Sequence, residues 1–255
     1  MTDYEFLNIE VNDGLAMITL NRAPLNILNS AMMAEFNSAL EHVLIENLAG
    51  VVIKATGKAF CAGVDIADHT ADKVGDMIRQ FHGIFRKLAA TDALTVAVVQ
   101  GAALGGGCEL ACMCDVVLAS ARAKFGQPEV QVGVFPPVAA CLLPMQVGVR
   151  KAVELTAVGA PIRADEALRI GLASHVWPTE EFDDRVKEYL DQLTKLSRPV
   201  MRLAKRSTVR AFREQFLAEL DRAEALYLDD LMKLSDAHEG IAAFMEKRSP
   251  SWKHA

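Results

Sequence analysis

Three consecutive glycines followed closely by an acidic residue, in the stretch Gly105-Gly106-Gly107-Cys108-Glu109, are the residues best suited to do chemistry. A strand-like apolar run enters this stretch, and a helix-like run leaves it. The amides in the first turn of a helix have no partner within the helix, and the helix dipole is positive at that end. Glycines also let a ligand come close to bare amides. The stretch thus combines hydrogen-bond donors that can hold a negatively charged oxygen with a nearby carboxylate. This combination indicates chemistry on a carbonyl compound.

Two other segments carry residues of the same kind. Residues 58–66 follow a short β-branched strand, and residues 125–129 place Pro128 directly before Glu129. Loops at strand ends are where functional sites are usually built. Taken alone, each segment has an ordinary explanation: a turn, close packing at glycines, or a surface carboxylate. Their occurrence together, in this order, favours a functional site.

The composition is that of an ordinary globular protein. The chain has 255 residues, of which 51% are hydrophobic and 24% charged, with a formal net charge of −6. This length suits one large core, or one domain with a small appendage. The acidic balance argues against nucleic-acid binding. We see no signal peptide and no run of 18 apolar residues, so we expect a cytoplasmic protein that does not span a membrane.

The five cysteines are an odd number in apolar surroundings, which is typical of reduced, buried thiols. Cys108, Cys112 and Cys114 raise the alternative of a metal site. Helical spacing would place Cys114 away from the face shared by the other two, and no histidine lies near in the sequence. We therefore expect no metal.

Apolar periodicity and turn residues predict the order of the elements. The expected strands are 6–11, 15–20, 51–55, 94–99, 115–119, 124–126 and 174–176. The expected helices are 31–46, capped by Asn29 or Ser30, then 72–90, 138–147, 150–158, 163–170 and most of the chain from about 179 onward. Asp236 and Glu239 match a capping box for a final helix that runs to about 248. Strand-strand-helix units at a spacing of roughly 45 residues indicate a stacked α/β spiral. No G-x-G-x-x-G or Walker A motif is present.

These segments together resemble the enoyl-CoA hydratase/isomerase (crotonase) superfamily. The resemblance extends from residue 18 to residue 248, and it is most specific at residues 62–66, 103–111 and 125–129. It implies an α/β fold, a crotonase-like spiral of ββα units with a C-terminal helical trimerisation region. We expect residues 1–195 to form the core with the active site and residues 196–255 to form the helical region.

The resemblance also implies roles for the residues of the site. Two backbone amides, those of Val64 and Gly106, would form an oxyanion hole for the thioester oxygen of an acyl-CoA. Such donors lower the barrier because that oxygen becomes enolate-like in the reaction. Glu109 would activate water and Glu129 would protonate the α-carbon. Isomerases of the family commonly keep one acid, so the retained pair favours hydration.

Contacts to CoA are expected in three parts of the chain. The loop after the strand 51–55 would meet the adenine with backbone groups, and the C-terminal helix would contact CoA, often from a neighbouring subunit. Arg22 is explained equally well as a contact to a CoA phosphate or as a solvated loop charge. Ala67 stands where the family often has a lysine that contacts phosphate, so that contact is not expected here. The expected CoA-binding residues are Ala62, Asp65, Ile66, Arg22, Phe244 and Lys247. CoA enters as part of the substrate, and no other cofactor is expected.

The main departure from the family pattern follows Glu129. Typical hydratases continue with open glycines, whereas residues 133–144 here carry bulkier apolar residues and prolines. Phe135 and Pro136 are therefore expected in the acyl pocket. This stretch, with residues 24–27 upstream, is similar to the cyclic dienoyl-CoA hydratases of anaerobic benzoyl-CoA degradation. The specific expectation is a cyclohexa-1,5-diene-1-carbonyl-CoA hydratase. The alternatives are a straight-chain enoyl-CoA hydratase, an enoyl-CoA isomerase, or a non-catalytic RNA-binding or protein-binding member.

A long amphipathic stripe in the C-terminal region bears on assembly. Apolar residues step by three or four from Val209 to Leu234. Packing on a neighbouring subunit and packing on the chain's own core explain such a stripe about equally well. The family pattern implies a homotrimer or homohexamer.

Overall fold

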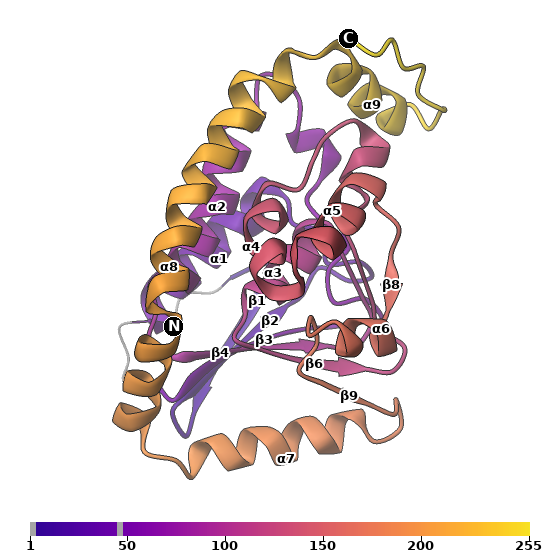
Figure 1. Ribbon diagram of the computed structural model, residues 1–255. Coiled ribbons are helices and arrows are strands. Elements are labelled where there is room, and N and C mark those ends of the chain that lie inside the picture. The colour runs from indigo at the N-terminus through magenta and orange to yellow at the C-terminus, as the bar shows by residue number, and fades with distance from the viewer. Residues whose placement is uncertain (1–3, 45–47) are drawn as a thin grey trace.

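A six-stranded sheet, in the order β1-β2-β3-β4-β6-β9, forms the base of the structure. The structure is a computed structural model that describes residues 4–44 and 48–255 (Figure 1). Among the described strands of this sheet, β1 and β2 pair in the antiparallel sense, and the other neighbours pair in parallel. The strands of this sheet are β1 (Leu7–Asn12), β2 (Leu15–Leu20), β3 (Gly50–Ala55), β4 (Leu94–Val99), β6 (Val116–Ser120) and β9 (His175–Trp177).

A second, three-stranded sheet has the order β5-β7-β8. It consists of β5 (Ala102–Leu104), β7 (Lys124–Gly126) and β8 (Ile162–Arg163). The chain alternates between the two sheets: β4 and β6 lie in the large one, and β5 and β7 follow them in the small one. A helix follows each such pair of strands, namely α3 (Gly106–Met113) after β5 and α4 (Pro137–Val147) after β7. This repetition is the ββα spiral that the sequence indicates.

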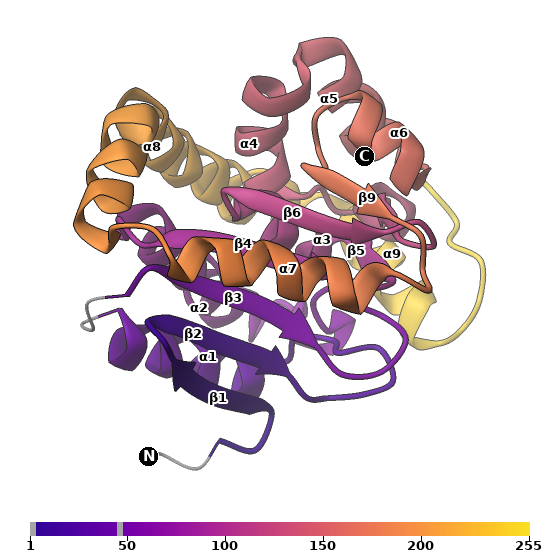
Figure 2. The same cartoon turned by 90° about the horizontal axis from the view of Figure 1, so that it is seen from below.

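The other helices enclose the sheets on both sides. Figure 2 shows α7 crossing the face of the large sheet that is turned away from α1, α2 and α3. The buried side chains of α7 join those of β2, β3, β4 and β6 in a small core, while the main core lies on the other face. These helices are α1 (Ser30–Val43), α2 (Val74–Ala90), α5 (Val149–Val158), α6 (Ala164–Arg169), α7 (Phe182–Thr194), α8 (Arg198–Asp229) and α9 (Ser235–Met245). Strands buried on both faces read as continuous apolar runs, which explains why β3 and β4 are recognisable in the sequence.

The helix ends confirm one capping prediction and contradict another. Asn29 caps α1, because its side chain accepts a hydrogen bond from the Met32 amide. The predicted end of this helix at residue 46 lies outside the described residues. The capping box at Asp236 and Glu239 is wrong: α9 begins at Ser235 and ends at Met245, and the Asp236 carboxylate instead accepts the amides of Lys253 and His254. The Asp236 side chain thus binds the C-terminal tail and does not cap the helix.

One buried polar residue ties two loops together beside the small sheet. Asn26 is completely buried; its Nδ2 donates to the carbonyls of Thr56 and Ala59, and its Oδ1 accepts the Arg22 amide. Buried polar groups need such partners because an unpaired one is costly. The loop after β2 therefore fixes the course of the loop after β3.

Within the described residues, no helix combines the length and the apolar character needed to cross a bilayer.

Candidate active site

The three chemistry-bearing segments run side by side. Cys61 forms a parallel bridge with Ala103 of β5, and Ala103 pairs in parallel with Phe125 of β7. The amide of Leu104 donates to the carbonyl of Cys61 at 2.9 Å, which extends this pairing by one residue. Parallel neighbours end at the same edge. The loops that carry Val64, Gly106 and Glu129 are thereby gathered at one edge of the small sheet.

The glycines allow this edge to be built. Gly105 caps α3 with φ 52° and ψ −131°, in the region that favours glycine, and its amide donates to the Gly126 carbonyl at 2.9 Å. Gly107 packs against the Cys61 carbonyl so closely that a Cβ there would overlap it. A Cβ at Gly106 would lie 2.7 Å from the Val64 side chain and 2.9 Å from that of Phe81. Backbone conformation therefore requires glycine at position 105, and close neighbours require it at positions 106 and 107.

Two backbone amides stand free beside the cavity. Within the described part of the chain, neither the Val64 amide nor the Gly106 amide donates a backbone hydrogen bond. The backbone groups on either side of the Val64 amide are occupied. The Gly63 carbonyl accepts the Leu28 amide, and the Asp65 amide donates to the Leu28 carbonyl. Gly106 opens α3, so its amide also lies at the positive end of the helix dipole. Such a pair of donors can hold an oxygen that gains negative charge.

Glu109 lies in the first turn of α3 and is 1% exposed. Its Oε1 accepts a hydrogen bond from the Ala139 amide at 2.7 Å. Burial raises the pKa of Glu109 to about 7, against the lowering effect of hydrogen bonds from the Ala139 and Val138 amides. A carboxyl group with this pKa can both accept and release a proton near neutral pH.

Glu129 comes from η2 (Pro128–Val132), directly after β7, and borders the same cavity. Its carboxylate lies over Gly105, since a Cβ at that glycine would be 2.7 Å from Glu129 Oε1. Its Oε2 is enclosed and has no hydrogen-bond partner within the described residues. Burial, followed by the charge of Glu109, raises the pKa of Glu129 well above its usual range. Because Glu109 has an amide donor and Glu129 Oε2 has none, Glu109 ionises first and Glu129 keeps its proton.

Both glutamates, and the two residues whose amides are free, line one cavity of about 270 Å³. Its wall is otherwise mostly apolar. Of the residues expected from the sequence, the structure places in this wall Ala62, Val64, Asp65, Ile66, Gly106, Glu109, Glu129, Phe135 and Phe244. The expected Arg22, Pro136 and Lys247 do not line it. The guanidinium of Arg22 donates to the Ile27 carbonyl at 2.8 Å, Pro136 is buried, and Lys247 is exposed beyond the end of α9.

Sequence reasoning missed several residues of this wall. Tyr227 comes from α8, is 1% exposed, and packs its ring on that of Phe135 with centroids 5.3 Å apart. His69 follows η1 (Ile66–Asp68), and its Nδ1 donates to the Asp65 carbonyl at 3.0 Å. Burial lowers the pKa of His69, so the ring is neutral at neutral pH. Tyr227 was visible in the sequence only as a member of an apolar stripe, although its hydroxyl group sets it apart there.

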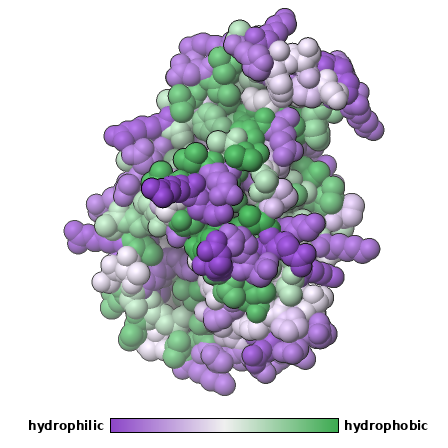
Figure 3. Space-filling view, turned by 45° about the vertical axis from the view of Figure 1, so that its right-hand side comes forward, coloured by the Kyte–Doolittle hydropathy of each residue, from purple (hydrophilic) through white to green (hydrophobic). Residues whose placement is uncertain are grey.

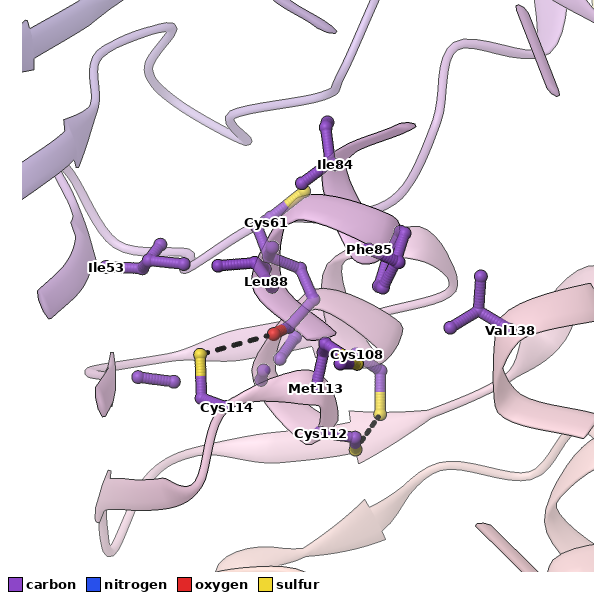
Figure 4. Close-up of a cluster of buried hydrophobic side chains, with 14 of the residues drawn as sticks. Ile53, Cys61, Ile84, Phe85, Leu88, Cys108, Cys112, Met113, Cys114 and Val138 are labelled. Atoms are coloured by element: carbon purple, nitrogen blue, oxygen red, sulfur yellow. Dashed lines mark hydrogen bonds between the residues drawn. The ribbon is translucent and has the colours of Figure 1, made fainter. Parts of the chain in front are cut away.

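The cysteines around α3 are arranged as helical spacing predicts. Cys108 and Cys112 face one another with their Sγ atoms 3.8 Å apart, and Cys114 turns toward the Leu110 carbonyl instead (Figure 4). All five cysteines are free and buried. Burial raises the pKa of the Cys61 thiol to about 12, so that thiol stays protonated. Among the described residues, no three His, Cys, Asp or Glu side chains are grouped to hold a metal ion.

Comparison with known proteins places the chain in a family. The model of the enoyl-CoA hydratase/isomerase family matches residues 10–255. The chain is 38% identical over 255 residues to a probable enoyl-CoA hydratase of Mycobacterium tuberculosis, covering 98% of this chain and 99% of the relative. It is 35% identical over 248 residues to a cyclohexa-1,5-dienecarbonyl-CoA hydratase of Thauera aromatica (96% and 95% covered). It is 34% identical over 259 residues to a crotonyl-CoA hydratase of Syntrophomonas wolfei (98% of each).

The fold agrees with solved structures as well. The chain superposes on an enoyl-CoA hydratase from Mycobacterium avium subsp. paratuberculosis with a TM-score of 0.87 at 30% identity, covering 98% of this chain and 100% of that one. The TM-score is also 0.87 for an enoyl-CoA hydratase/isomerase from Xanthobacter autotrophicus, at 26% identity with 96% and 94% covered.

The raised pKa of Glu109 predicts a dependence of stability on pH. The native state holds this proton more tightly than the unfolded state does, so the free energy of unfolding should fall as pH rises from about 4.5 to about 7. Gln at this position carries no titrating proton and keeps an acceptor for the Ala139 amide. Well above neutral pH, Glu109→Gln should therefore be more stable than the unaltered protein by roughly 2 to 3 kcal/mol.

Urea unfolding at a series of pH values measures this difference. Glu10→Gln, at an exposed site on β1, is the matched control and should follow the unaltered protein. Equal stability of Glu109→Gln and the unaltered protein at high pH would contradict the burial of a titrating carboxyl at residue 109.

Proposed function

Because the chain belongs to the enoyl-CoA hydratase/isomerase family and is an enzyme of the hydro-lyase type, we propose that it adds water to an α,β-unsaturated acyl-CoA. The observation that carries this proposal is a pair of glutamates, Glu109 and Glu129, that line one cavity together with two residues whose amides are free. An isomerase needs one group to move a proton along the acyl chain. A hydratase needs a base for the proton of water and an acid for the α-carbon, and the cavity holds both.

Each proposed step uses one of these groups. The thioester oxygen accepts hydrogen bonds from the Val64 and Gly106 amides. These bonds strengthen as the oxygen becomes enolate-like, and one such donor lowers the barrier by about 3 to 4 kcal/mol. The Glu109 carboxylate takes a proton from water, whose oxygen attacks the β-carbon. The Glu129 carboxyl then gives its proton to the α-carbon. The adduct contains one water, and the two carboxyl groups have exchanged their protonation states.

CoA itself would lie at the open end of this cavity. Ala62, Asp65 and Ile66 border the cavity from the loop after β3, and Phe244 of α9 borders it from the other side with 55% of its surface exposed. We propose that these residues contact the CoA moiety. Arg22 and Lys247 lie outside the cavity wall, so their proposed phosphate contacts would form with the outer part of CoA.

For the acyl group we propose a cyclic dienoyl substrate, cyclohexa-1,5-diene-1-carbonyl-CoA. Two observations support it: the similarity to a relative of that name in Thauera aromatica, and the presence of Phe81, Phe135 and Tyr227 among the residues that line the cavity. Flat rings suit a flat, six-membered acyl group. A straight-chain enoyl-CoA is the second candidate, and the similarity to a crotonyl-CoA hydratase favours it.

Turnover of two substrates tests the function and the acyl group separately. The purified protein is offered crotonyl-CoA and the cyclic dienoyl-CoA, and mass spectrometry follows the gain of one water in the product. We expect hydration of both, with the larger kcat/KM on the cyclic substrate. Preference for crotonyl-CoA would overturn the acyl assignment alone. No hydration of either would overturn the hydratase proposal.

Removal of each carboxyl group tests the two proposed catalytic roles. Glu109→Gln and Glu129→Gln keep the shape of the side chain but abolish proton transfer, so each should lower kcat by about 100- to 10,000-fold. Binding of butanoyl-CoA, which cannot react, should persist in both variants and is measured by calorimetry. Glu10→Gln serves again as the control. A variant that hydrates at close to the unaltered rate would remove that glutamate from the mechanism.

We propose further that copies of the chain assemble as a homotrimer or homohexamer through the helical region 196–255. The support lies in α8, whose buried residues all fall in its second half, whereas Val200 and Leu203 in its first half are 64% and 59% exposed. Apolar residues also show on the face that carries α5 and α6 (Figure 3), where Val149, Val153 and Val158 are exposed. Exposed apolar side chains in such number are typical of subunit contacts.

Sedimentation equilibrium of the purified protein should give three or six times the chain mass of 27.7 kDa. Leu203→Glu places a charge on the exposed half of α8 and should lower this mass, while Glu10→Gln should leave it unchanged. A monomeric mass for the unaltered protein would refute the assembly.

A further inference from the structure

Two complementary polar atoms in the cavity wall have no partner. The Tyr227 hydroxyl and Glu129 Oε2 are both enclosed, and neither has a hydrogen-bond partner among the described residues. One is a donor and the other is an acceptor when ionised. Both residues border the cavity that holds the proposed reaction. Unpaired buried polar atoms are rare in native structures and call for an explanation.

The charge of Glu129 acts on the Tyr227 hydroxyl. Burial, then the charge of Glu129 and then that of Glu109, raises the pKa of the Tyr227 hydroxyl. Tyr227 is therefore a neutral donor at any pH at which the enzyme works. The groups whose charges act on Glu129 are Glu109 and Cys108, both from α3. None of these neighbours supplies a positive charge to the Glu129 carboxylate.

Other donors in the cavity wall are already engaged. His69 donates from Nδ1 to the Asp65 carbonyl, and because its ring is neutral, Nε2 is left as an acceptor. The Gln131 amide points to the Gly159 carbonyl at 3.4 Å. The free amides of Val64 and Gly106 are reserved, in the proposed mechanism, for the thioester oxygen. Among the described side chains of this wall, Tyr227 is the neutral donor that remains for Glu129.

The position of the Tyr227 ring is set by packing. It is 1% exposed, contacts the ring of Phe135 at a tilt of 56°, and projects from the second half of α8, which is the buried half. Glu129, in contrast, projects from a short 3₁₀ turn, and its side chain borders open cavity. Movement of the Glu129 side chain is therefore the cheaper way to join the two atoms.

We propose that the Tyr227 hydroxyl donates a hydrogen bond to Glu129 Oε2 when an acyl-CoA fills the cavity, which makes Tyr227 the positioning residue of the proton donor. This inference rests on the proposed hydratase function. With Oε2 held by Tyr227, the reactive proton sits on Oε1, the oxygen that lies over Gly105. The proton is thereby directed to the α-carbon, next to the carbonyl that the amides hold. The hydrogen bond also stabilises the carboxylate that remains after the transfer.

Tyr227→Phe removes this hydrogen bond and leaves the ring packing intact. We expect kcat for hydration to fall by about 10- to 100-fold with little change in KM, because a hydrogen bond to a charged carboxylate is lost. The alkaline limb of the pH–rate profile should move to higher pH by about one unit, since the carboxylate loses a donor. Tyr189→Phe, the same change on α7 outside the cavity, is the control and should match the unaltered enzyme.

A double-mutant cycle separates positioning from a general structural role. If Tyr227 acts through Glu129, adding Tyr227→Phe to Glu129→Gln should slow hydration no further than about twofold. If Tyr227→Phe lowers kcat in the Glu129→Gln background as much as it does in the unaltered enzyme, the inference is overturned. A lower kcat in Tyr227→Phe with an unshifted alkaline limb would overturn it too. Unaltered kcat and profile in Tyr227→Phe would overturn it as well.

A measurement without turnover keeps this inference separate from the proposed function. NMR of the side-chain carboxyl carbons, with the Glu129 signal assigned by its loss in Glu129→Gln, follows the titration of that carboxyl with butanoyl-CoA bound. We expect a higher pKa for Glu129 in Tyr227→Phe than in the unaltered protein. The same pKa in both would refute the hydrogen bond, even if the protein hydrates enoyl-CoA. A shifted pKa without any hydration would retain the hydrogen bond and refute only the function.

Discussion

The parallel pairing of β5 with β7, continued by the hydrogen bond from the Gly105 amide to the Gly126 carbonyl, is the contact on which the rest of the site depends. Because of this pairing, β5 and β7 end at the same place. Glu109 follows β5 in α3, and Glu129 follows β7 in η2. A slip of one residue would turn every side chain of a strand to its other face. Residues 103 and 125 belong to different ββα units, so the spiral brings together carboxyl groups that lie twenty residues apart in the sequence.

Burial at this edge has two consequences that belong together. The apolar wall that suits an acyl group also removes Glu109 and Glu129 from solvent, and this raises the pKa of both carboxyl groups. The amide of Ala139 then distinguishes them, because it stabilises the charged form of Glu109 alone. The proposed division into base and acid follows from this difference in donors and from the charge of Glu109, which raises the pKa of Glu129 further. Buried carboxyl groups cost stability, and such a cost is typical of functional sites.

The C-terminal helices complete a cavity that the spiral leaves open. Tyr227 of α8 and Phe244 of α9 line it, although both lie more than one hundred residues after Glu109 in the chain. In the sequence, Tyr227 is one of many apolar positions spaced by three or four, and such a stripe does not tell which member faces a ligand. The predicted capping box at Asp236 failed for a related reason. A local pattern offered one partner for the carboxylate, and the tail at Lys253 and His254 supplied another.

The sequence alone determined most of the elements, the ββα order and the three segments that carry the site, although the short strands β5 and β8 were not among the expected ones. Runs of buried β-branched residues, glycines that tolerate no Cβ and a proline before Glu129 are local features, and local chemistry restricts them to few conformations. Only the tertiary structure decided which residues share the cavity: it brought Tyr227 and His69 into the wall and left Arg22, Pro136 and Lys247 outside. It alone also decided the pKa order of the glutamates, because burial and the donor from Ala139 depend on α4 packing against α3. Distances between residues far apart in the chain arise from packing, and no spacing along the sequence contains them.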